Sequence, residues 1–139
     1  MDLEKAKALL QQGTFTCVLC KGEQVYTSSL RGVAPLMEHW RNGTRLQGFS
    51  AADKVVGKAT ALLYCLLQVK AVYAQVLSRP ALAVLEAHGV AVCWGQLVDA
   101  IINRAGDGFC PMEMATKDVA DPAAAPAVIE AALEKLKQR

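Results

Sequence analysis

The sequence lacks a long uninterrupted apolar stretch. The longest apolar run, Ala59 to Leu67, contains Thr60 and is far shorter than the roughly 18 residues that a membrane-spanning helix needs. The N-terminal stretch from Met1 to Lys7 is charged and has no apolar centre of the kind found in a secretory signal. We therefore expect a cytoplasmic protein with no membrane partner.

The chain also lacks a surplus of one charge. Its 15 Lys and Arg residues face 13 Asp and Glu residues, and the two signs are interleaved along the chain. Nucleic-acid binding domains usually carry a basic stripe or patch, and this sequence offers none. We therefore expect no nucleic-acid partner.

Paired cysteines are missing as well. The five cysteines are odd in number and scattered, which does not fit a disulfide framework. Cys17 and Cys20 have the CxxC spacing of zinc and redox sites, but residues three apart on a strand point to opposite faces. We interpret both as core residues.

What the chain has is aliphatic bulk. Hydrophobic residues make up 53% of the 139 positions, whereas aromatic residues make up only 6%. This length suits one domain over residues 1–139, in which 121–139 form a linker and a C-terminal helix. The apolar surplus indicates a sheet covered on both faces or an interface between copies, and we expect a homo-oligomer.

Hydrophobic periodicity divides the chain into alternating helices and strands. The predicted elements are, in order, a helix over 2–12, strands over 14–20 and 24–28 that form a hairpin, a helix over 33–41, a long helix over 50–67, a strand over 71–77, a helix over 78–88, a strand over 90–93, a helical segment over 95–102, a turn of helix from 110 and a last helix over 127–137. The last two strands and the helix between them form a parallel β-α-β unit.

The long helix is predicted to begin at Ser50, because Ser50-Ala-Ala-Asp53 fits a capping box. A helix that feeds directly into the next strand begins at the edge where that strand ends. This places Asp53, Lys54 and Lys58 close to Ser78, at the carboxyl edge where open α/β sheets bind ligands.

Two predicted helix N-termini at this edge suit an anion. Lys54 and Lys58 are four residues apart, so they share a helix face and add positive charge. We therefore expect a small anionic or nucleotide-like ligand at the carboxyl edge. The plainer alternatives are that both lysines form a solvated face and that Asp53 only caps its helix. The predicted ligand-binding residues are Asp53, Lys54, Lys58, Ser78, Arg79, Asn103 and Arg104.

The order of these elements resembles the cytidine deaminase fold. In those enzymes a His/Cys-x-Glu pair and a Pro-Cys-x-x-Cys motif supply three zinc ligands and a general acid/base glutamate. This chain keeps Pro80, but the two cysteine positions after it hold Ala81 and Val84. Because catalytic zinc needs three protein ligands, we expect no metal ion, no other cofactor and no cytidine deamination.

More closely, residues 14 to 117 resemble an uncharacterised family of small deaminase-like proteins. The resemblance rests on Asp53-Lys-Val-Val-Gly-Lys-Ala59, on Asn103 and Arg104, and on Cys110-Pro-Met-Glu113. It implies a deaminase-like fold and no established activity. Together with the predicted elements, we expect a three-layer α-β-α fold with a four-stranded mixed sheet.

Three classes of function stay open. The first is a metal-free relative of the deaminases that binds the ligand described above. The second is a thiol-dependent enzyme using Cys110, since a cysteine at a helix N-terminus can be reactive. The third is a non-enzymatic oligomeric interaction module. The candidate catalytic residues are Cys110, Asp53 and Glu113.

Overall fold

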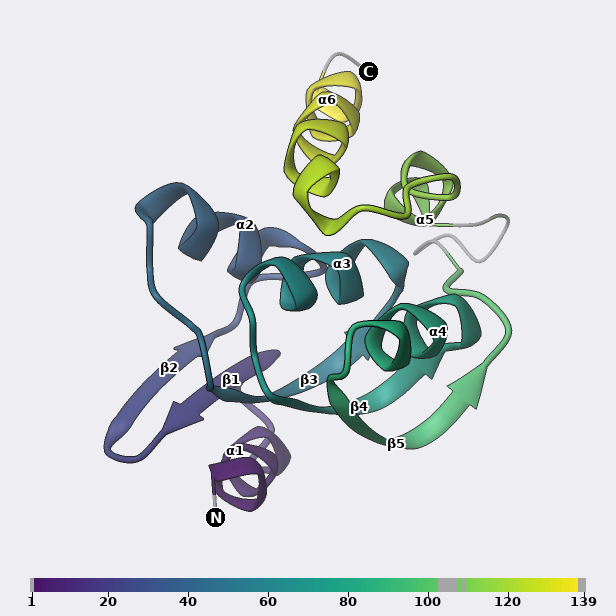
Figure 1. Cartoon of the computed structure of the whole chain (residues 1–139). Coiled ribbons are helices and arrows are strands. Elements are labelled where there is room, and N and C mark those ends of the chain that lie inside the picture. The colour runs from purple at the N-terminus through teal and green to yellow at the C-terminus, as the bar shows by residue number, and fades with distance from the viewer. Residues whose placement is uncertain (1, 103–107, 109, 138–139) are drawn as a thin grey trace.

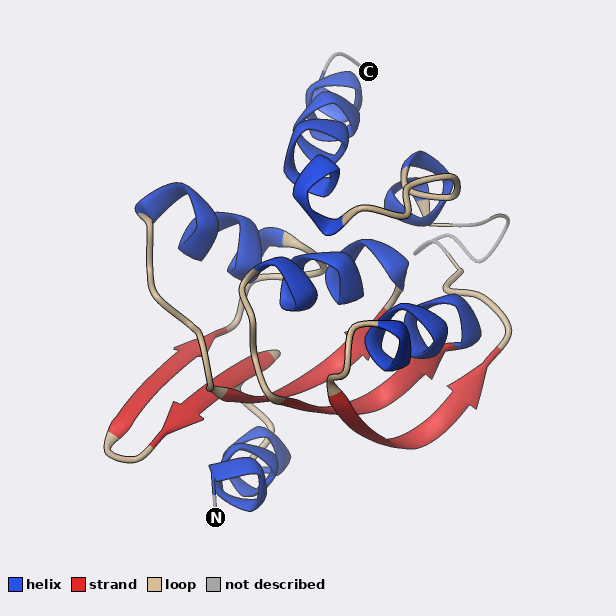
Figure 2. Cartoon of the chain, viewed as in Figure 1, coloured by secondary structure: helices blue, strands red, loops and turns tan. Residues whose placement is uncertain are grey.

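A five-stranded mixed sheet with helices on both faces organises the chain (Figures 1 and 2). The structure is a computed structural model that describes residues 2–102, 108 and 110–137. Its elements are α1 (Asp2–Gln11), β1 (Cys17–Lys21), β2 (Gln24–Ser28), α2 (Ala34–Asn42), β3 (Ser50–Val56), α3 (Lys58–Leu66), β4 (Ala71–Ser78), α4 (Arg79–Ala87), β5 (Ala91–Val98), α5 (Pro111–Ala115), the 3₁₀ turn η1 (Pro122–Ala124) and α6 (Ala125–Lys137).

The strands lie in the order β2-β1-β3-β4-β5. β1 pairs antiparallel with both β2 and β3, whereas β3, β4 and β5 run parallel to one another. The hairpin predicted around Lys21 to Glu23 is confirmed, and so is the parallel pairing of the last two strands. The three parallel strands bring their carboxyl ends to one edge of the sheet.

Ser50 does not begin a helix. Ser50–Val56 is β3, the central strand, and α3 begins at Lys58 after Gly57. The predicted capping box at Ser50 and Asp53 is therefore wrong, because tertiary pairing on both sides of this segment overrides its weak strand propensity. The sheet accordingly has five strands in place of the four predicted.

The segment after Cys93 also differs from the prediction. Gly95 to Val98 continues β5, and it is not helical. Gly95 lies against the backbone of β4, where a Cβ atom would come within 2.9 Å of the carbonyl oxygen of Gln75. The apolar spacing after Gly95 therefore belongs to a strand.

The two faces of the sheet carry separate cores. α1 covers one face alone, and α2, α3 and α4 cover the other, with α5 and α6 beyond them (Figure 1). α3 is buried along most of its length. Cys17 belongs to the core on the α3 face and Cys20 to the core on the α1 face, as predicted from their spacing.

Near the carboxyl ends of the central strands, the alternation of side chains between the two faces of the sheet shifts by one residue. Pairing is continuous except at Lys54 on β3 and Gln75 on β4. Ala51 and Val56 are five residues apart and would face opposite ways on a regular strand, yet both pack into the α3-face core.

Within the described residues, no helix is long and apolar enough to span a bilayer.

Candidate functional site

A small cavity opens at the carboxyl edge of the parallel strands. Its volume is about 70 Å³. The lining is mostly apolar and carries one carboxylate, one thiol and one hydroxyl. The lining residues are Gly32, Val33, Val55, Gly57, Ala59, Thr60, Ile101, Cys110, Met112 and Glu113.

Glu113 is the charged group of this cavity. Its Oε2 accepts a hydrogen bond of 3.0 Å from the backbone N–H of Lys58, at the start of α3. Its Oε1 is buried and accepts no hydrogen bond of normal geometry from residues 2–102, 108 and 110–137. The carboxylate therefore occupies the positive end of α3 with one oxygen, and the other oxygen turns away from that helix end.

Gly57 makes room for that carboxylate. A Cβ atom at Gly57 would lie 2.4 Å from Oε1 of Glu113, so a larger residue would displace it. The backbone at Gly57 has φ −96° and ψ −178°, which any residue adopts. Glycine is therefore needed at position 57 for the space that it leaves beside Glu113, and not for its backbone conformation.

A second helix begins next to Glu113. Ser78 ends β4 and caps α4, because its hydroxyl accepts a 3.2 Å hydrogen bond from the N–H of Ala81. Burial raises the pKa of the Glu113 carboxyl, while the N–H of Lys58, the hydroxyl of Ser78 and the ammonium of Lys58 lower it. Two helix N-termini do meet at this edge. One is that of α4, as predicted from Ser78, and the other is that of α3, which begins at Lys58 instead of at Ser50.

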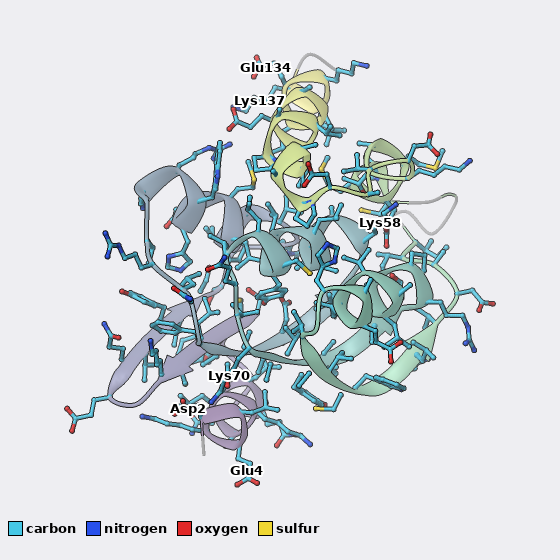
Figure 3. All side chains as sticks on the ribbon, viewed as in Figure 1. Asp2, Glu4, Lys58, Lys70, Glu134 and Lys137 are labelled. Atoms are coloured by element: carbon cyan, nitrogen blue, oxygen red, sulfur yellow. The ribbon has the colours of Figure 1, made fainter. Side chains whose placement is uncertain are left out.

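Of the four predicted cations, the three that the structure describes do not line this cavity. The Nζ of Lys58 donates a 2.7 Å hydrogen bond to the carbonyl of Lys117, and Figure 3 shows Lys58 between α3 and α5. Arg79 pairs with Asp99 at 2.8 Å on the exposed surface. Lys54 lines a different cavity on the α1 face.

Asp53 lies beneath the cavity and does not line it. Its carboxylate accepts a 2.7 Å hydrogen bond from the hydroxyl of Tyr64 and a 3.3 Å bond from the N–H of Val55. The Sγ of Cys17 lies 3.4 Å from the Tyr64 hydroxyl oxygen. Thr60 and Tyr64 share one face of α3, so this buried cluster sits one helical turn below the cavity.

Burial dominates the chemistry of this cluster. It raises the pKa of Asp53 to about 7, although the hydrogen bonds from Tyr64 and from the backbone of Val55 and Lys54 lower it. Burial and the Asp53 carboxylate also raise the pKa values of Cys17 and Tyr64. The Cys17 thiol and the Tyr64 hydroxyl are therefore neutral at physiological pH.

Cys110 lines the cavity. It directly precedes α5, which agrees with the turn of helix predicted from residue 110. Its N–H donates a 3.0 Å hydrogen bond to the carbonyl of Ile101. Asn103 and Arg104, also predicted to bind the ligand, lie outside the described residues. Among the residues that the structure describes, no three His, Cys, Asp or Glu side chains are placed to hold a metal ion.

The TM1506 domain of unknown function (DUF1893) matches residues 5–133. The chain belongs to the DUF1893 family. This confirms the prediction of an uncharacterised family. The crystal structure of a DUF1893 family protein (TM1506) from Thermotoga maritima matches with a TM-score of 0.85 at 22% identity, covering 94% of this chain and 88% of that one.

A second solved structure matches this DUF1893 chain more loosely. It is a diaminohydroxyphosphoribosylaminopyrimidine deaminase/5-amino-6-(5-phosphoribosylamino)uracil reductase, also from Thermotoga maritima. The TM-score is 0.45 at 12% identity, covering 68% of this chain and 35% of that one. No curated protein matches the chain.

The buried cluster of Asp53, Tyr64 and Cys17 in this DUF1893 chain was not predicted from the sequence. One signal was available, because Tyr64 lies in a helix that is apolar almost all round and a buried tyrosine hydroxyl needs a partner. The pairing of Cys17 with Asp53 across neighbouring strands had no such signal, since Asp53 was assigned to a helix.

The contact between Gly57 and Glu113 predicts a coupled pair of substitutions. Gly57→Ala should lower the free energy of unfolding by about 1 to 2 kcal/mol, because the displaced carboxylate loses its bond to Lys58. In a Glu113→Ala background, Gly57→Ala should cost little. Urea denaturation of wild type, both single variants and the double variant measures the coupling. A cost that is equal in both backgrounds would mean that only a general cap preference for glycine is involved.

Asp53 predicts a pH dependence of stability. Its pKa is about 7 in the folded chain and near 3.8 otherwise, so folding takes up a proton between these values. Stability should therefore fall as the pH rises from about 4 to about 7, by up to about 4 kcal/mol, and then level off. Glu113 contributes in the same direction.

Asp53→Asn removes this titration, so its stability curve should be flatter and should lie above wild type at pH 8. The matched control is Asp118→Asn, at an exposed position. Chemical denaturation from pH 4 to 8 makes the comparison. A slope unchanged in Asp53→Asn would show that Asp53 is ionised throughout this range.

Proposed function

We propose that this protein binds a small nucleotide-like molecule at the carboxyl edge of the sheet, with the base-like group in the cavity beside Glu113. The observation that carries the proposal is the Glu113 carboxylate in the cavity wall: its Oε1 is buried and accepts no hydrogen bond of normal geometry from the described residues, although the neighbouring Ser78 hydroxyl lowers the pKa of the carboxyl. A buried carboxylate oxygen without a partner is costly. A ligand N–H donor, such as the amino group of a nucleobase, would satisfy it.

The rest of the lining suits a flat ring. Val33, Val55 and Met112 supply apolar surface, and Thr60 supplies a hydroxyl at the cavity wall. A volume of about 70 Å³ exceeds the roughly 10–15 Å³ that one water needs but falls below the roughly 300–1,000 Å³ of drug-sized pockets. The cavity therefore fits one part of a ligand, and the remainder lies outside it.

The anionic part of the ligand belongs at the rim in this proposal. Lys58 and Arg79 are the first residues of α3 and α4, and both side chains reach the exposed surface. A phosphate outside the cavity would compete for Lys58 with the carbonyl of Lys117. Such exposed cations contribute only modestly to the binding free energy, so a ligand with a phosphate binds somewhat more tightly than one without it.

A catalytic role for the same cavity is the second candidate. Cys110 and Glu113 line it together and come from one turn of the chain, so a thiol and a carboxylate face the same small space. Cys110 would act as a nucleophile toward a bound electrophile, with Glu113 available to move the thiol proton. This thiol-dependent alternative stays a prediction.

Binding of nucleotides tests the first candidate. We expect at least one of the adenosine, cytidine, guanosine and uridine 5′-monophosphates to bind, as measured by titration calorimetry. Glu113→Gln should weaken that binding about tenfold, because the amide turns an N–H toward the ligand donor in place of an oxygen. Glu134→Gln, on the exposed surface of α6, is the control.

Lys58→Ala should weaken the monophosphate more than the matching nucleoside, because only the monophosphate carries the charge that Lys58 would contact. The proposal fails if none of the four nucleotides binds at millimolar concentration. It also fails if Glu113→Gln and Glu134→Gln bind equally well.

The edge strand β5 supports the predicted homo-oligomer. This eight-residue strand is an edge of the sheet and contains no charged residue and no proline. Natural edge strands usually carry such residues, because an open edge pairs with other strands. Trp94 of β5 is 40% exposed. We propose that β5 pairs with β5 of a second copy.

Light scattering at micromolar concentration tests this assembly. We expect the wild type to be a dimer, and Trp94→Lys to be a monomer because two like charges would meet across the interface. Val25→Lys is the matched control, since Val25 is 38% exposed on the opposite edge strand. A monomeric wild type would contradict the proposal, and so would equal behaviour of both variants.

A further inference from the structure

A second cavity lies on the opposite face of the sheet, beside α1. Its volume is about 300 Å³, more than that of the carboxyl-edge cavity. It is lined by Leu10, Gln11, Gly13, Lys54, Tyr73 and Gln75. The carboxyl-edge cavity shares none of these residues.

The shortness of α1 explains why this space exists. α1 ends at Gln11 and packs mainly against β1 and β3. Ala52 and Tyr73 belong to the core beneath α1, and Lys54 and Gln75, two residues further along their strands, line the cavity next to the end of this helix. Beyond the end of α1, these two side chains face a gap where the sheet is left uncovered.

The lining has the chemistry of an anion site. It contains one ammonium, two side-chain amides and one phenol, and it contains no acid. A second ammonium is adjacent, because the Nζ of Lys7 lies 4.6 Å from the centre of the Tyr73 ring. In residues 2–102, 108 and 110–137, neither Lys7 nor Lys54 forms an ion pair.

The acids of α1 are placed away from this cavity. Asp2 and Glu4, labelled in Figure 3, lie in the first turn of the helix. The cavity adjoins the last turn, at Leu10 and Gln11. A helix rises 1.5 Å per residue, so about 10 Å or more of helix separates them from Gln11. This distance is comparable to the screening length in physiological salt, so Lys54 sets the charge at the cavity, whereas Glu4 lies three residues from Lys7 and offsets part of the charge of that lysine.

We propose that this α1-face cavity binds a small organic oxyanion, with Lys54 as its counter-charge and the amides of Gln11 and Gln75 as hydrogen-bond donors. The ring of Tyr73, which is only 8% exposed, forms an apolar wall for the body of the ligand. The carboxylate of an organic acid and the phosphate of a small ester share the required chemistry. This site is independent of the nucleotide-like ligand proposed above.

Two probes, benzoate and inorganic phosphate, test the proposal on the full chain by NMR titration. Benzoate combines a carboxylate with a ring, and phosphate has no apolar body. We expect at least one probe to shift the side-chain amide signals of Gln11 and Gln75 in a saturable way. Benzoate alone would identify an organic acid site, and phosphate alone a phosphate site. No saturable shift at either amide with either probe would overturn the proposal.

Three variants decide whether Lys54 carries the binding. Lys54→Met should weaken the bound probe about tenfold, as expected for loss of a charge-assisted hydrogen bond. Gln11→Leu, at an exposed position that need not disturb the fold, should weaken it severalfold. Lys137→Met on α6 keeps the same loss of charge far from the cavity and should leave the affinity unchanged. Equal affinities in Lys54→Met and Lys137→Met would show nonspecific attraction to lysines and would overturn the proposal.

Discussion

The carboxylate of Glu113 at the start of α3 is the contact on which the carboxyl edge depends. It joins two segments that lie 55 residues apart in the chain, and a second bond from Lys58 to Lys117 holds the same segments together. Because Gly57 has no side chain, α5 can approach the sheet closely enough for this bond to form. One residue thus closes the cavity, satisfies a helix N-terminus and supplies the only carboxylate among the lining residues that the structure describes.

Below that contact, the interior is polar where a core is usually apolar. Asp53 lies on the central strand, and its main side-chain partner, Tyr64, comes from the helix above it. A charge in such a position is expensive to bury, which is why the carboxyl holds its proton to a higher pH. The same hydrogen bond links α3 to β3 one helical turn from Thr60, which lines the cavity.

Much of the fold could be predicted from the sequence, because hydrophobic period and cap residues agree with it. The hairpin, the strand at Ala71 and the helix capped by Ser78 follow such local signals. The central strand did not follow them, since Ser50-Ala-Ala-Asp53 has the composition of a helix start and becomes a strand only through its neighbours. Because this strand was assigned to a helix, Lys54 and Asp53 were predicted to lie at a site that they do not line. Cys110 and Glu113 do line the cavity. Their short helix begins where Pro111 indicates.

The weak strand character of β3 also bears on how the chain emerges during synthesis. β1 precedes β3 in the chain and covers one of its edges, whereas the other edge pairs with β4, which is synthesised later, on the order of seconds at about 5–20 residues per second. Small residues and an aspartate are poor templates for pairing with foreign strands. The small residues and the aspartate that give β3 its low strand propensity thus also lower the risk of aggregation for the nascent chain.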